Sequence, residues 1–120
     1  MNFDEIETAD CKILSFMKIK NDIKIKFNYL YVVSDKCYCD NMIIVIAEVD
    51  GVEICRFNGD EMAVEKVSAI DDYYDFGIEM IQKVNVENNL VTMGCFSING
   101  EWLEVSCQSN NIRVYKQVCF

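Results

Sequence analysis

The chain has 120 residues, no histidine and no proline, and its 20 acidic and 11 basic side chains give a formal net charge of −9. The absence of histidine removes the commonest general base and the commonest metal ligand at neutral pH. The excess of carboxylates creates a negative surface that attracts basic partners and disfavours direct binding of nucleic acid. The composition therefore predicts a small acidic binding protein rather than an enzyme, with no catalytic residues, no metal site and no cofactor.

The length fits a single domain over residues 1–120, and with 52% apolar residues the chain can bury one core. The first residues, Met1–Glu7, are acidic and lack the basic start and apolar run of a signal peptide. The longest apolar run, Met42–Ala47, is too short to cross a membrane. These features predict a cytoplasmic protein without a membrane segment, in which the seven cysteines stay reduced.

Alternation of polar and apolar residues predicts strands in the first half of the chain. A first strand is expected over residues 11–18, and a second over residues 23–33, where the alternation has a period of two. The nearly continuous apolar segment 42–49 is typical of a central strand buried on both faces. Asp50-Gly51 predicts a hairpin turn into a returning strand over residues 52–57. One face of the second strand is expected to carry Ile23, Ile25, Phe27, Tyr29, Tyr31 and Val33. Leu30 and Val32 interrupt the opposite, polar face, which leaves open that the far end of the strand is covered on both sides.

Residues 60–83 fit two interpretations. The apolar residues before position 68 suit either a short strand or a helical turn. A helix that begins at Ser68 or Asp71 and ends near Lys83 is the favoured interpretation of the rest, although Gly77 would weaken it by about 1 kcal/mol. The apolar face of that helix would carry Tyr74, Ile78 and Ile81.

The last third of the chain is typical of an antiparallel meander. Strands are expected over residues 90–98, 101–108 and 112–119, and Asn99-Gly100 suits a type I′ hairpin turn. The whole pattern predicts an α+β fold, a mainly antiparallel β meander of about seven or eight strands with one helix packed on or beside the sheet.

An acidic cluster lies within the predicted helix. Three of its carboxylates would stack on one helical face at i, i+4 and i+8, and the two tyrosines among them belong to a residue type enriched at interface hot spots. We therefore predict a docking ridge for lysines and arginines of a partner, formed by Asp71, Asp72, Tyr73, Tyr74, Asp75 and Glu79. The alternative is an ordinary solvated helix face, on which Asp71 and Asp72 interact favourably with the helix dipole.

Trp102 is the only tryptophan, and it lies between Glu101 and Glu104. If Leu103 and Val105 face the core, Trp102 and Glu104 face outwards, and an exposed tryptophan between carboxylates is a candidate anchor. In the opposite register the indole belongs to the core, because a strand buried on both faces hides the alternation. Trp102 and Glu104 are predicted as further partner-binding residues, and the register stays open.

Cys37 and Cys39 form the only closely spaced cysteine pair, with Asp35 and Asp40 nearby. Structural zinc usually takes four ligands, and the sequence offers no second pair at suitable spacing. Redox pairs are more often separated by two residues. We predict neither a metal site nor a redox site here.

The segment Phe96–Val105 has the sequence Phe-Ser-Ile-Asn-Gly-Glu-Trp-Leu-Glu-Val. It combines a strand that ends in an aromatic residue, a glycine turn, and Trp-x-Glu at the start of the next strand. This pattern resembles small bacterial immunity proteins, the antidotes encoded beside polymorphic and contact-dependent growth inhibition toxins. The alternating run 23–33, followed by a short loop with cysteine and aspartate, is also similar, and the resemblance covers about half of the chain.

The resemblance implies a small cytoplasmic protein without enzymatic activity that binds one cognate toxin domain, commonly a nuclease. A nuclease surface is basic because it holds phosphates, and an acidic inhibitor associates with it quickly. The predicted function is therefore neutralisation of such a toxin through an acidic surface, by a monomer or a weak dimer. Two alternatives stay open: an acidic inhibitor of the phage or regulatory type that mimics nucleic acid, and a general interaction module whose charge maintains solubility.

Overall fold

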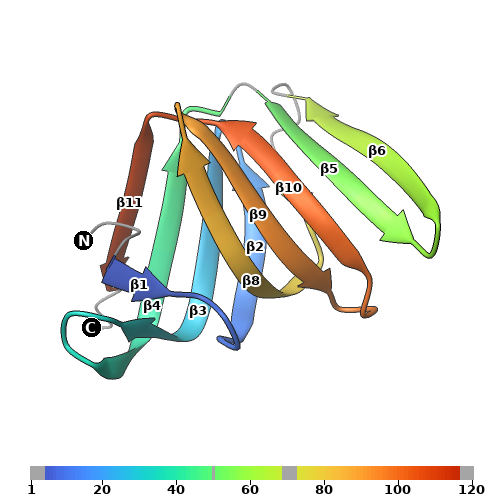
Figure 1. The fold of residues 1–120 in the computed structure, drawn as a ribbon. Helices are drawn as coiled ribbons and strands as arrows, with labels where there is room; N and C mark the ends of the chain where they lie inside the picture. The colour runs from blue at the N-terminus through green and yellow to red at the C-terminus, as the bar shows by residue number, and fades with distance from the viewer. Residues whose placement is uncertain (1–4, 50, 69–72, 117–120) are drawn as a thin grey trace.

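The computed structural model describes residues 5–49, 51–68 and 73–116, which form eleven β-strands and no α-helix. The strands belong to two antiparallel sheets that pack on one another (Figure 1). The antiparallel β character is confirmed, whereas the predicted helix, and with it the α+β class, is wrong. None of the described residues belongs to a helix that is long and apolar enough to cross a membrane.

Each sheet combines strands that are distant in the sequence. Sheet A has the order β11 (Asn111–Lys116), β4 (Cys37–Ala47), β3 (Asp22–Val32), β2 (Ile13–Ile19), β7 (Tyr73–Asp75), and β1 (Ile6–Glu7) pairs with the far end of β3. Sheet B has the order β6 (Glu61–Ser68), β5 (Gly51–Asn58), β10 (Trp102–Gln108), β9 (Leu90–Ser97), β8 (Ile78–Glu87). An isolated antiparallel bridge between Lys12 and Met80 links the two sheets.

The chain leaves sheet A after β4 and enters sheet B at β5. The two strands are not paired with each other, so the hairpin expected at Asp50-Gly51 is wrong; Asp50 itself lies outside the described residues. The reason lies in Val49, which is buried and donates its backbone N–H to the carbonyl oxygen of Asn21 at 2.8 Å. This hydrogen bond connects the segment after β4 to the β2–β3 turn, so the chain does not fold back to pair β5 with β4.

The core lies between the sheets and follows from the alternation of side chains along the strands. The part of β4 from residue 42 to residue 47 is buried on both faces, as predicted for a central strand. Met42, Ile44 and Ile46 belong to the main core. Ile43, Val45 and Ala47 form a second, smaller cluster on the outer face of sheet A.

The region of the predicted helix contains β7 and the first part of β8. Tyr74, Phe76 and Ile78 face inwards with the period of a strand, and a bulge after Ile78 then moves the inward position to Ile81. The resulting spacing of 74, 78 and 81 imitates one face of a helix. Gly77, which has a φ of +62°, separates β7 from β8, and its backbone N–H donates a hydrogen bond to Asp75 Oδ1 at 3.0 Å.

The buried face of β3 changes along its length. Ile23, Ile25 and Phe27 are fully buried as predicted, but Leu30 and Val32 are buried beyond them, so Tyr29, Tyr31 and Val33 lie on the outer side. The prediction of one continuous apolar face up to Val33 is therefore wrong. The inward face changes at the point where Asn41 of the neighbouring strand has a φ of +56°. At the same level Asn28 donates its backbone N–H to the carbonyl oxygen of Lys12. The far half of the β3–β4 hairpin consequently presents its tyrosines to solvent.

Candidate protein-binding face

Trp102 lies on the outer face of sheet B. Leu103 and Val105 are fully buried, and Trp102 and Glu104, which alternate with them along β10, are only partly buried. The structure therefore places the indole outside the core and settles the register that the sequence left open. Trp102 and Glu104 share this face, as the outward register requires.

A row of large apolar side chains crosses all five strands of sheet B at the level of Trp102. Trp102 is paired with Phe96 of β9 on one side and with Phe57 of β5 on the other. Phe96 is in turn paired with Met80, and Phe57 with Met62. Because directly paired residues point to the same face of a sheet, these five side chains form one outward surface, which we call the apolar ladder. Met62 is 61% exposed and Phe96 is 37% exposed, so the ladder is open to a partner.

Gly94 determines how the indole lies. A Cβ atom at this position would be 2.7 Å from Cζ2 and 2.8 Å from Cη2 of Trp102, so the indole lies directly over the glycine. The Phe96 ring packs edge to face on the indole at 5.1 Å, and Lys83 Nζ is 5.9 Å from the ring centroid. The indole is thus held in one orientation before any partner arrives, which lowers the entropy cost of binding.

Carboxylates also occur at the end of sheet B that carries the ladder. The β5–β6, β7–β8 and β9–β10 connections lie at this end, along the lower edge of sheet B in Figure 1. The last two are joined by a hydrogen bond from the Ile98 N–H to the Gly77 carbonyl oxygen at 3.0 Å. Four acidic residues of the β5–β6 turn, the start of β8 and the β9–β10 turn, which we call the acidic rim, are Asp60, Glu61, Glu79 and Glu101, of which Glu101 is partly buried.

A network of polar side chains lies on the inner side of sheet B, at the same end as the ladder. Arg56 Nε lies 3.2 Å from Glu65 Oε2, and the Tyr74 hydroxyl donates a hydrogen bond to Glu65 Oε1 at 2.7 Å. The hydrogen bond from Tyr74 lowers the pKa of Glu65 below its usual range. Burial opposes this shift, and Arg56 adds to it. Burial and the bond to Glu65 together raise the pKa of Tyr74. Arg56 and Tyr74 are therefore engaged within the protein.

The predicted docking ridge is not a single surface, because the helix that was to assemble it is absent. Tyr73 and Tyr74 are neighbours on a strand and point to opposite faces, with Tyr73 64% exposed and Tyr74 directed inwards. Glu79 is exposed and belongs to the acidic rim, whereas Asp75, which is also exposed, is paired with Met17 and lies on the outer face of sheet A. Asp71 and Asp72 lie outside the described residues.

Four of the five ladder residues are not among the binding residues predicted from the sequence. A signal was available, because Phe57 and Met62 flank one hairpin turn and Phe96 and Trp102 flank another. Pairing each hairpin from its turn outwards would have placed these aromatic and methionine side chains opposite each other. Joining the two hairpins into one row still requires the β5–β10 pairing, which spans about half of the chain.

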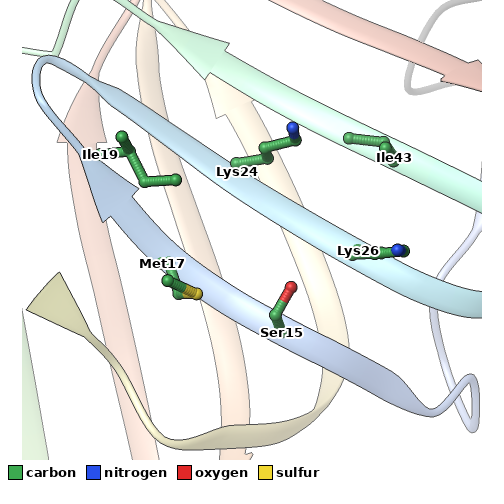
Figure 2. A pocket seen from close by; sticks show the side chains of 6 residues that line it. All are labelled: Ser15, Met17, Ile19, Lys24, Lys26 and Ile43. Atoms are coloured by element: carbon green, nitrogen blue, oxygen red, sulfur yellow. The ribbon is translucent and has the colours of Figure 1, made fainter. Parts of the chain in front are cut away.

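The outer face of sheet A is a second open surface, of mixed character. Figure 2 shows a shallow pocket on it, with an approximate volume of 210 Å³. Lys24 and Lys26 extend from β3 beside Ile43, which is almost fully buried because such long side chains cover it with their stems. The pocket is lined by Ser15, Met17, Ile19, Lys24, Lys26 and Ile43. Its apolar floor is thus largely filled by the protein's own side chains.

The six cysteines within the described ranges are distributed over both sheets. Cys37 is exposed and Cys39 partly buried at the start of β4, and both thiols are free. Within the described ranges, no three Cys, Asp or Glu side chains gather in a way that could hold a metal ion. Burial raises the pKa of Cys95 to about 12 and that of Cys107 to about 11, which keeps these thiols protonated and unreactive.

Comparisons with known proteins match no protein-family model, no curated protein and no solved structure.

Proposed function

We propose that this protein is a cytoplasmic antidote that binds and neutralises a cognate toxin domain with a basic surface. The toxin class that we propose is a nuclease. The observation that carries the proposal is the apolar ladder centred on Trp102, with carboxylates in the turns at the same end of sheet B. The proposal assigns the protein a binding role and no catalytic step.

The ladder has the chemistry of an interface centre. Protein interfaces are enriched in aromatic residues and methionine, and tryptophan is the residue type most characteristic of hot spots. Here two phenylalanines and two methionines extend from a preoriented indole across a whole sheet. An apolar centre with a polar border is the arrangement that excludes water from the strongest contacts.

The acidic rim supplies the preference for a basic partner. Its four carboxylates act together with the formal net charge of −9 to attract a positive surface, and opposite fields raise the rate of association. A nuclease domain presents such a surface, because it must hold the phosphates of its substrate. Rapid association suits an antidote, because free toxin is harmful until it is bound.

The first experiment is to identify the partner by purifying the tagged protein with the product of the neighbouring gene. The kinetics of that complex are then measured for Trp102→Ala, with Leu90→Ala as a matched control on the same face but far from the ladder. We expect Trp102→Ala to weaken the complex by about 30-fold or more, the cost typical of a hot-spot residue, mainly through faster dissociation. Leu90→Ala should leave the affinity nearly unchanged.

The rim is tested separately by neutralising Asp60, Glu61, Glu79 and Glu101 to the corresponding amides. A control variant with the same change in net charge neutralises Glu7, Asp35, Glu48 and Glu87, which are exposed and lie away from the ladder. The rim variant should associate more slowly at low salt than the control variant, and the difference should shrink as ionic strength rises. Equal association rates for the two variants, or wild-type affinity for Trp102→Ala, would contradict the proposed face.

A further inference from the structure

Three tyrosine rings pack edge to face on the outer side of the β3–β4 hairpin. The Tyr38 ring centroid lies 5.3 Å from that of Tyr29 and 5.1 Å from that of Tyr31, with interplanar angles of 89° and 65°. The register explains the cluster, because Tyr31 is paired with Tyr38 and Tyr29 with Asp40, so that all four side chains share one face. Tyr38 is 64% exposed, and its ring is therefore accessible from solvent.

Carboxylates border these rings. Tyr29, Tyr38, Asp10 and Asp40 line an open hollow with an approximate volume of 760 Å³, which we call the tyrosine hollow. Lys116 Nζ lies 3.1 Å from Asp40 Oδ1, so an ammonium group of this chain already neutralises one oxygen at the border of the hollow. The faces of aromatic rings are negative, and rings and carboxylates together favour a cationic ligand.

The geometry points to the tyrosine hollow as a binding site for an arginine side chain of a partner protein. A guanidinium group is planar, so it can stack on a tyrosine ring while it donates hydrogen bonds to a carboxylate. A lysine ammonium group is a point charge and satisfies these two demands less well. The net charge of −9 makes the surface complementary to a basic protein segment. The hollow lies on sheet A, away from the ladder, and its assignment does not depend on toxin neutralisation.

The test uses short capped peptides and the isolated full-length protein, so it requires no knowledge of the natural partner. The probe is acetyl-Gly-Arg-Gly-amide, compared with the corresponding lysine peptide and with the citrulline peptide, which has the shape of arginine without its charge. Binding is followed by NMR through the ring resonances of Tyr29, Tyr31 and Tyr38. We expect the arginine peptide to shift these resonances in a saturable manner, the lysine peptide to bind more weakly, and the citrulline peptide to have no effect.

Variants separate a cation site from an aromatic cluster with a purely structural role. Tyr38→Leu should weaken binding of the arginine peptide by about two- to fivefold, the usual effect of a ring at an exposed cation site, whereas Tyr38→Phe should retain it. Tyr115→Leu removes an exposed tyrosine elsewhere on sheet A and serves as the control. Lys116→Met should tighten binding, because it frees Asp40 from its internal counter-ion.

The inference fails if the citrulline peptide binds as well as the arginine peptide, or if the shifted resonances lie away from the three tyrosines. Equal affinity for the arginine and lysine peptides would overturn the assignment to guanidinium. An unchanged affinity in Lys116→Met would remove Asp40 from the site. None of these outcomes bears on the ladder, which is tested with the toxin complex.

Discussion

Gly94→Ala is the sharpest test of how the indole of Trp102 is held. Gly94 lies in β9 without a positive φ, so its backbone conformation suits alanine. At such a position the substitution normally stabilises a protein by about 0.4–1 kcal/mol, because it restricts the unfolded chain. Here the added methyl group would lie 2.7 Å from the indole and 2.9 Å from Lys83 Cε, so the indole must move.

The two contributions have opposite signs, and the steric one should prevail. Overpacking by one methyl group costs about 1–3 kcal/mol, so Gly94→Ala should lower the free energy of unfolding by about 1 kcal/mol after the unfolded-state gain is subtracted. In a Trp102→Ala background the clash with the ring is gone and only the flexible end of Lys83 must shift. There Gly94→Ala should be neutral or stabilising by up to about 1 kcal/mol.

The assay is urea denaturation of the four proteins of the double-mutant cycle, followed by far-UV circular dichroism because the Trp102→Ala variants lack tryptophan fluorescence. A coupling between the two positions of about 1–3 kcal/mol is expected. In Gly94→Ala alone, the emission of Trp102 should also report a more solvated ring. If Gly94→Ala changed stability equally in both backgrounds, within about 0.5 kcal/mol, the indole would not lie over this glycine.

Two further predictions concern other parts of the molecule. Tyr74→Phe removes the hydrogen bond to Glu65 and should cost about 0.5–1.5 kcal/mol of stability at neutral pH in chemical denaturation. Because the folded pKa of Glu65 is depressed, this contribution is present above its ordinary value of 4.5 and disappears as the pH falls through the lower folded value, so wild type and variant should converge in acid. Thiol alkylation at neutral pH, read by peptide mass spectrometry, should modify exposed Cys37 well before buried Cys95 and Cys107, and equal rates would contradict the burial of the last two.

The strand content could be predicted from the sequence because burial alternates with a period of two along most strands. The segment 42–49 has apolar residues on both faces, and the structure places it in the middle of sheet A with neighbours on either side. Leu103 and Val105 alternate with Trp102, and the outward register is one of the two that the sequence allowed. These features depend on local sequence, which one chain displays directly.

The wrong predictions occur where an irregularity in a strand changes which residues face the core. A bulge after Ile78 gives residues 74, 78 and 81 the spacing of a helix, and no local signal distinguishes this from a true helical face. A similar shift in β3 exposes Tyr29 and Tyr31, which the simple alternation had placed with the core. The ladder is a different case, because it is defined by pairing across five strands and thus by tertiary register.

The order in which the strands are synthesised constrains how this protein can fold. Strand β10 inserts between β5 and β9, and β11 pairs with β4, so each sheet depends on a strand near the C-terminal end of the described chain. Pairings between such distant segments make folding slow, because the entropy cost of closing long loops precedes the gain from contacts. A nascent chain that ends before Trp102 can form the β5–β6 and β8–β9 hairpins but cannot join them. The ladder therefore comes into existence in one late step, and any truncation or stalled synthesis before that step yields two unconnected hairpins with exposed edges.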